Sequence, residues 1–211
     1  YGVATFNFKK VPKTYNVVVS FKGDENYLSS KVSSKIVISK ASTSIVAPNV
    51  RSYLTQSTYL KIALKDSKGN AISKRKILVT VSGKTYSLTT DSKGFTKLKF
   101  ANKVRNIKVL INFKGDSYYL ASSKTSKVVI TKMKTYIEAP SIKSYLTQSN
   151  YFTATLKNAY NKGVAKKTLR VTVGKKVYKL TTNSKGVIKL KLKNKYTNVK
   201  VLTKFVGNSK Y

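Results

Sequence analysis

Apolar residues alternate with polar ones, mostly lysines, along most of the chain. Successive side chains of a β-strand point to opposite sides of the sheet, so a period of two predicts strands with one buried and one solvated face. No segment carries the 3.6-residue period of a helix. In the middle of the chain, the residues expected to line a core are Leu60, Ile62, Leu64, Val79, Val81, Leu98, Phe100, Val109, Ile111, Phe113, Val128 and Ile130. The lysines between them, such as Lys97 and Lys99, should face solvent.

The whole pattern recurs every 92 residues. Gly2, Gly94 and Gly186 head near-copies of one segment, and residues 53–57 recur as residues 145–149. Phe6 and Phe8, or Leu190 and Leu192, take the places of Leu98 and Phe100. A fixed period of this length indicates a tandem array of one small domain.

Turn-forming sequences separate the alternating runs within each repeat. Residues 66–70, 82–84, 91–94 and 114–117 combine Gly with Asp or Ser, which favour tight turns. About seven short strands per 92-residue repeat are typical of an immunoglobulin-like antiparallel β-sandwich. The chain is therefore expected to be all-β, as tandem immunoglobulin-like sandwiches. The expected domains are the C-terminal part of a repeat in 1–40, a complete repeat in 41–132 and a repeat lacking its last strand in 133–211.

The two junctions between repeats are short. Residues 38–43 and 130–135 contain neither Gly nor Pro, so bending there should be limited. Equivalent junctions predict similar rotations between successive domains and hence a regular rod.

The chain is strongly basic, with 43 Lys and Arg against six Asp and Glu, and a net charge of +37. At 41% hydrophobic residues it can still form a core. A lysine coat attracts any polyanion through counterion release, such as acidic glycans, cell-wall polymers or DNA. Lysines also solvate strand faces and discourage aggregation. Polyanion binding and solvation are therefore both possible roles of the lysines. Sequence-specific recognition of nucleic acid favours Arg, which is scarce here. The residues of the candidate polyanion-binding stripe are Lys61, Lys65, Lys97, Lys99, Lys108, Lys189, Lys191 and Lys200.

Little in the sequence points to catalysis or to a cofactor. Cys and His are absent, which removes disulfides, thiolate metal sites and the commonest general base. Asp66, Asp91 and Asp116 lie in turn sequences, where a short acceptor caps backbone N–H groups. No apolar run is long enough for a transmembrane helix. A covalent Lys–Asn or Thr–Gln cross-link needs a buried carboxylate, and Glu138 is the acid with strand-like neighbours. We therefore expect no enzyme, cofactor or metal site.

Three motifs carry a resemblance to a known family. Residues 64–72 contain D-x-x-G-x-x-h, where h is an apolar residue, and residues 86–94 end in T-D-x-x-G. Residues 113–122 read F-x-G-D-x-x-Y-x-x-S, and this loop returns at 21–30 and in part at 205–211. These stretches resemble the immunoglobulin-like domains of invasin- and intimin-type bacterial adhesins, and still more the repeats of adhesin-like surface proteins of methanogenic archaea. The resemblance implies an extracellular, cell-surface stalk or adhesin segment.

The expected function is that of a structural stalk or spacer in a large extracellular adhesin-like protein. The incomplete repeats at both ends also suggest contacts with neighbouring copies and a contribution to a fibre. The alternative is a lysine-rich adhesion module that binds anionic polymers through unspecific electrostatics.

Overall fold

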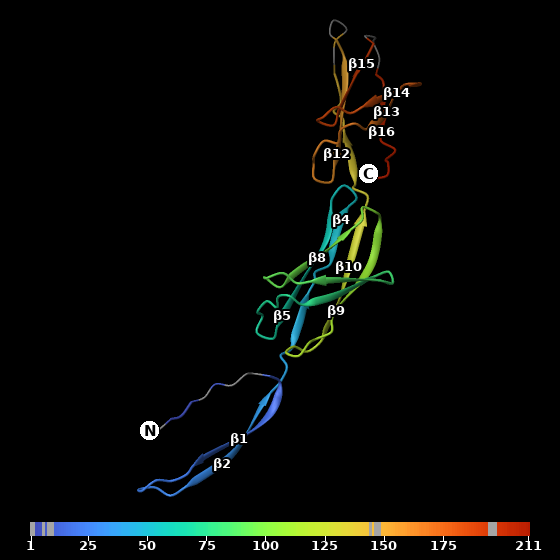
Figure 1. Ribbon diagram of the computed structural model, residues 1–211. Helices are drawn as coiled ribbons and strands as arrows, with labels where there is room; N and C mark the ends of the chain where they lie inside the picture. Colours follow the sequence, from blue (N-terminus) through green and yellow to red (C-terminus); the bar gives the residue numbers. More distant parts are fainter. Residues whose placement is uncertain (1–2, 6, 8–10, 144, 146–148, 194–197) are drawn as a thin grey trace. The chain divides into compact units, whose positions relative to one another are not determined.

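The computed structural model describes the chain except residues 1–2, 6, 8–10, 144, 146–148 and 194–197 (Figure 1). Phe6 and Phe8, expected in a core, and Thr147 and Gln148, considered for cross-linking, lie outside the described residues. The described residues form strands and loops with no helix, and so no helix that could cross a membrane. The prediction of an all-β chain is confirmed.

The chain divides into two compact units. One comprises Tyr1–Arg51, Tyr59–Phe100 and Asn106–Val129, and the other comprises Ser52–Thr58, Ala101–Arg105 and Ile130–Tyr211. Strands of the central sandwich run from the first unit into the short end segments assigned to the second.

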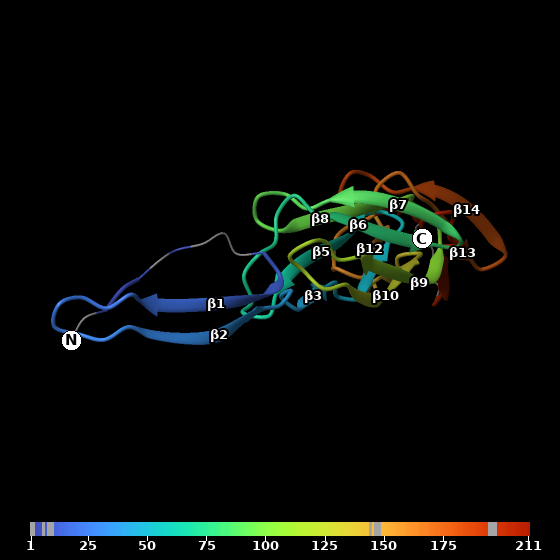
Figure 2. The same cartoon turned by 60° about the horizontal axis from the view of Figure 1, so that its bottom comes forward.

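Residues 41–132 form one sandwich of two sheets. Its strands are β3 (Thr43–Val46), β4 (Val50–Tyr53), β5 (Thr58–Asp66), β6 (Lys76–Val81), β7 (Lys84–Thr89), β8 (Phe95–Phe100), β9 (Arg105–Phe113) and β10 (Ser122–Thr131). One sheet has the order β3-β5-β8 and the other β4-β10-β9-β6-β7 (Figure 2). These orders correspond to A-B-E and A′-G-F-C-C′ of an immunoglobulin-like sandwich.

The sandwich has eight strands where about seven were expected. The extra strand arises at the start of the repeat, where the segment Ala47-Pro48-Asn49 separates β3 from β4. Proline cannot donate to a strand ladder, so it marks the point where the chain leaves one sheet for the other.

The core follows the alternation of the sequence. All twelve residues expected there are buried, and Lys97 and Lys99 are exposed. Ile45, Ile72 and Ile77 are buried with them. Between β6 and β7, Ser82 and Gly83 both have positive φ, as the tight turn of a two-residue hairpin requires.

Six strands of the third repeat correspond to strands of the second repeat, about 92 residues further along the chain. Its strands are β11 (Thr135–Glu138), β12 (Tyr151–Asn158), β13 (Thr168–Val173), β14 (Lys176–Thr181), β15 (Val187–Lys191) and β16 (Val201–Lys204). They pair in the orders β11-β12-β15 and β14-β13-β16. Phe152, Leu156, Leu169, Val171 and Ile188 are buried between these sheets.

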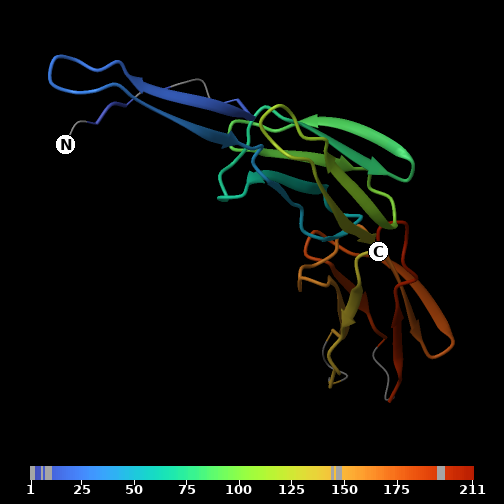
Figure 3. The same cartoon turned by 90° about the horizontal axis from the view of Figure 1, so that it is seen from below.

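The first repeat contributes an antiparallel hairpin of β1 (Lys13–Phe21) and β2 (Ser30–Ile38) (Figure 3). These strands are the counterparts of β9 and β10. Val19 in β1 is 58% exposed, whereas the equivalent Ile111 in β9 is fully buried. The same pattern is therefore buried only where a second sheet covers it.

Truncating the core should be costly only on the buried side of a strand. Ile111→Ala should lower the free energy of unfolding by about 2–5 kcal/mol, because it removes transfer energy and leaves a cavity. Leu110→Ala, at the neighbouring 43% exposed position, should cost about 0.5 kcal/mol or less. Urea unfolding followed by circular dichroism measures both, and equal losses would contradict the assignment of faces.

Candidate functional site

The sandwich begins and ends with segments that run side by side in the same direction. Ala41 donates its N–H to the Tyr118 carbonyl at 2.9 Å, and its carbonyl accepts from the Leu120 N–H at 2.9 Å. Ala41 and Tyr119 form a parallel bridge. The first residues of the repeat are therefore attached to the loop that precedes its last strand.

The pairing continues along the chain. Thr43 Oγ1 lies 2.7 Å from Ser122 Oγ, and the Ser126 hydroxyl donates to the Ala47 carbonyl. The Lys127 N–H donates to Asn49 Oδ1 at 2.8 Å, and β4 then lies beside β10. Residue numbers rise together on both sides, so the arrangement is parallel. We call the pairing of residues 41–49 with residues 118–127 the parallel seam.

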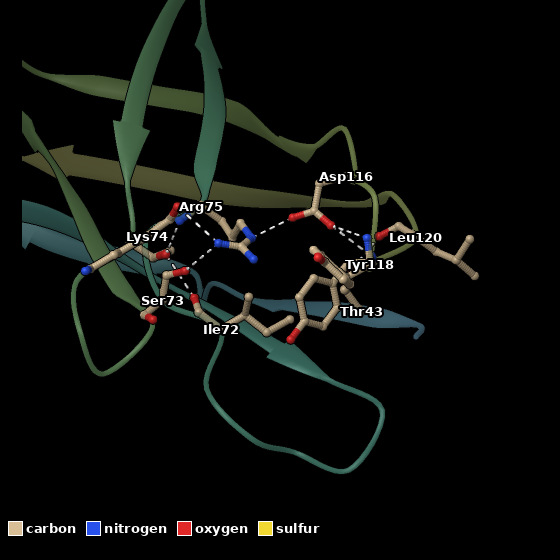
Figure 4. Close-up of polar contacts among 10 residues, drawn as sticks. Thr43, Ile72, Ser73, Lys74, Arg75, Asp116, Tyr118 and Leu120 are labelled. Atoms are coloured by element: carbon tan, nitrogen blue, oxygen red, sulfur yellow. Dashed lines mark hydrogen bonds and ion pairs between the residues drawn. The ribbon is translucent and has the colours of Figure 1, made fainter. Parts of the chain in front are cut away.

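The loop before β10 is held by an ion pair. Arg75 Nε lies 2.6 Å from Asp116 Oδ2 (Figure 4). The Arg75 guanidinium lies 5.6 Å from the centroid of the Tyr119 ring. Asp116 Oδ1 accepts the N–H groups of Tyr118 and Tyr119. A hollow of about 430 Å³ borders this pair, lined by Arg75, Leu78, Phe113 and Asp116 among others. The ion pair and the two backbone caps of Asp116 thus both act on the loop that carries the start of the parallel seam.

The surroundings of Asp116 favour its charged form. Partial burial alone would raise the pKa of the carboxyl, but the two backbone N–H donors and the Arg75 guanidinium outweigh it. The pKa of Asp116 consequently lies below its ordinary value.

The third repeat builds the same attachment without the ion pair. Met133, the counterpart of Ala41, is buried and donates its N–H to the Lys210 carbonyl at 3.1 Å. Lys167 and Asn208 replace Arg75 and Asp116, and Lys167 Nζ lies 5.8 Å from the centroid of the Tyr211 ring. The cation over the tyrosine is kept while the carboxylate is lost.

The turn acids act as backbone caps, as predicted. Asp66 Oδ1 accepts the N–H groups of Lys68 and Asn70, and Asp91 Oδ1 accepts those of Lys93 and Phe95. In the third repeat the equivalent positions are Asn, and their amide oxygens accept the same pairs of N–H groups. Because a neutral amide caps the same backbone N–H groups, these turns need an oxygen acceptor and not a negative charge.

The structure divides the candidate lysine stripe between two sheets. Lys61 and Lys65 lie on β5, and Lys97 and Lys99 lie on the adjacent β8. Lys108 lies on β9, which belongs to the other sheet. Lys108 therefore lies on a different sheet from the other four candidate lysines of the second repeat. Alternation along a strand gives the outward side of that strand but not the sheet to which the strand belongs.

The third repeat divides its lysines in the same way. Lys189 and Lys191 lie on β15, in the sheet with β11 and β12. Lys200 directly precedes β16, in the sheet with β13 and β14. Whether any of these lysines binds a polyanion stays a prediction.

Tyrosines lie against several of the lysines on β8 and β15. Lys97 Nζ and Lys99 Nζ lie 5.3 and 5.9 Å from the centroid of the Tyr59 ring. Lys189 Nζ lies 4.0 Å from the centroid of Tyr151, the counterpart of Tyr59. Such contacts hold an ammonium group over the electron-rich face of the ring.

Glu138 does not have the environment that a cross-linking reaction needs. Its side chain is 52% exposed, and its Oε2 lies 2.6 Å from Lys157 Nζ on the neighbouring strand. The hydrogen bond to Glu138 raises the pKa of Lys157, which keeps the amine protonated and so not nucleophilic.

Sequence reasoning missed the pairing of Arg75 with Asp116. The signal was nonetheless present, because both positions change together between repeats, to Lys167 and Asn208. The parallel seam had no such signal, since Ala41, Ala47 and Asn49 contribute mainly backbone atoms or short side chains.

The sequence matches no family model and no curated protein. Several solved structures are similar in fold. A bacterial ice-binding adhesin has 10% identity, with 87% of this chain and 64% of that chain covered and a TM-score of 0.39. The Escherichia coli adhesin FdeC has 18% identity and a TM-score of 0.33, with 85% of this chain and 65% of that chain covered. Invasin, a bacterial integrin-binding protein, has 11% identity and a TM-score of 0.37, with 81% of this chain and 37% of that chain covered. The chain spans less than two thirds of each of these structures. The similarities are distant, and the immunoglobulin-like topology rests on the strand order itself.

The two roles of Asp116 can be separated by mutation. Asp116→Asn should keep both backbone caps, as Asn208 does, and lower the free energy of unfolding by at most about 1 kcal/mol through loss of the ion pair. Asp116→Ala also removes the acceptor for two N–H groups and should cost about 1–3 kcal/mol. Urea unfolding of both variants tests this. Equal losses would mean that the ion pair, and not the cap, holds the loop.

Asp116→Asn should also change the dependence of stability on pH. A carboxyl whose pKa is lowered on folding stabilises the folded state above its unfolded pKa, and this contribution disappears as the pH falls through the folded pKa. The unmodified protein should therefore lose more stability than the variant between about pH 5 and pH 2. Thermal unfolding across that range provides the measurement, and parallel curves would show that Asp116 contributes no pH dependence.

Proposed function

We propose that this chain is a structural stalk segment of an extracellular, adhesin-like surface protein, and that its domains carry tension between their two ends. The role is mechanical and not enzymatic. The observation that carries the proposal is the parallel seam. The extracellular, cell-surface setting is part of the proposal and is supported by the motif resemblance of residues 113–122 and its copies.

The direction of the seam decides how it responds to a pull. The chain enters the sandwich at Ala41 and leaves it after Thr131, at the ends of the two paired segments. Because these segments run parallel, a pull on the chain slides them past each other in opposite directions. The contacts from Ala41 to Lys127 are then loaded together, in shear, and must fail together. An antiparallel pair pulled from one end would open one bond at a time.

Repetition extends this property along the array. Met133 enters the third repeat through the same kind of backbone attachment that Ala41 makes in the second. In an array of repeats, stability is close to a sum of domain and junction terms, so each added domain adds length without new chemistry. The regular rod expected from the equivalent junctions remains a prediction.

Single-molecule force spectroscopy of the chain, held at its two ends, tests the proposal. The seam variant Asn49→Ala/Ser126→Ala removes two side-chain contacts of the seam and should lower the force at which the 41–132 sandwich unfolds. The control Ile77→Ala removes a fully buried side chain of β6, outside the seam, and should cost about 2–5 kcal/mol at equilibrium.

The seam variant should lower the unfolding force more than the control does, even where its equilibrium loss is smaller. Urea unfolding of the same proteins supplies that comparison. If the unfolding forces of both variants followed their equilibrium stabilities, the seam would not be what resists the pull.

A further inference from the structure

We propose that the outer face of sheet β3-β5-β8 binds a linear acidic polysaccharide, with Tyr59 ordering the lysine pair that holds it. This proposal goes beyond the stalk role and does not depend on it. The lysine face is defined by the residues that alternate with the core on these strands and are not themselves buried, namely Ser44, Val46, Tyr59, Lys61, Lys65, Phe95, Lys97 and Lys99. It carries four lysines and no carboxylate.

Tyr59 distinguishes this face from an ordinary lysine coat. Its ring has both Lys97 Nζ and Lys99 Nζ within 6 Å of its centroid. These contacts bias two long side chains toward defined positions before any ligand arrives. Less side-chain entropy is then lost on binding than for free surface lysines.

The geometry fits an extended polymer with regularly spaced charges. Lys97 and Lys99 are two residues apart on β8, so their Cα atoms are separated by roughly 6.6–6.8 Å. Lys61 lies on β5, about 4.8 Å away in the direction of the sheet hydrogen bonds. Ammonium groups act as point charges that suit single carboxylates. Phe95, 48% exposed beside them, offers an apolar surface for the C–H face of a sugar ring.

Nucleic acid fits the lysine face less well. The arginines lie on other sheets: Arg51 on β4, Arg105 on β9 and Arg170 on β13, while Arg75 directly precedes β6. The lysine face therefore carries no guanidinium for bidentate recognition of a base. A flat sheet face inserts nothing into a duplex groove. Tyr59 as a residue is 36% exposed, and two ammonium groups lie within 6 Å of its ring centroid, which limits stacking of single-stranded bases on the ring.

The third repeat has a weaker version of the same face. Tyr151, Lys189 and Lys191 occupy the equivalent positions, with Tyr151 opposite Lys191 across the strands, and Lys189 Nζ lies over the Tyr151 ring. Thr153 replaces Lys61, and Glu138 brings a negative charge that pairs with Lys157. Most of the binding should therefore come from the lysine face of the second repeat.

The test compares variants of equal charge on different faces of the full chain. Lys97→Gln/Lys99→Gln removes the ordered pair, and Lys108→Gln/Lys127→Gln removes two exposed lysines from neighbouring strands of the other sheet. Binding to polygalacturonate is measured by titration calorimetry at low and at physiological salt. The first variant should bind about tenfold more weakly than the unmodified chain, and the second less than about twofold more weakly.

Tyr59→Leu keeps every charge and tests the ordering directly. It should weaken binding about two- to fivefold, which unspecific electrostatics does not predict. Circular dichroism checks that all variants stay folded. Equal losses for the two lysine pairs, an unchanged affinity of Tyr59→Leu, or no binding to polygalacturonate would each overturn the proposal. Tighter binding of duplex or single-stranded DNA at the same salt would overturn it in favour of nucleic acid.

Discussion

The parallel pairing of the first and last segments of the repeat is the constraint on which the rest of the sandwich depends. It joins the two parts of the repeat that are farthest apart in sequence, from Ala41 beside Tyr119 to Asn49 beside Lys127. Once this edge is closed, the crossing at Pro48 follows, because the segment must leave the β5 sheet to reach β10. Loop closure over most of a domain costs conformational entropy, and several hydrogen bonds formed along one edge offset that cost together.

The Arg75–Asp116 pair supports this edge indirectly. It anchors Asp116 in a loop whose backbone, at Tyr118 and Leu120, provides the partners of Ala41. In the third repeat the caps of Asn208 give the loop the same form, although the carboxylate is gone. Shape is thus set by backbone hydrogen bonds to one oxygen, and the ion pair adds to a conformation that already exists.

Much of the fold could be predicted because the domain obeys one rule strictly. Leu60, Ile62 and Leu64 alternate with polar neighbours, and each is buried. The same rule could not separate Lys97 from Lys108, since both are outward on their own strands and only the strand order assigns them to different sheets. The eighth strand was missed because β3 and β4 are four residues each, too short to show a period. Tyr59 contacts Lys97 and Lys99 because β5 and β8 are adjacent strands of one sheet. That adjacency cannot be predicted from the local sequence of either strand.

The interchange of Asp and Asn in the turns has a consequence for how the sequence of a repeat can change. Asp66, Asp91 and Asp116 correspond to Asn158, Asn183 and Asn208, and each pair makes the same two backbone caps. A codon change from one of these asparagines to aspartate therefore produces a turn that the fold already contains. The charge of a repeat can change one unit at a time in this way while the same two backbone N–H groups stay capped.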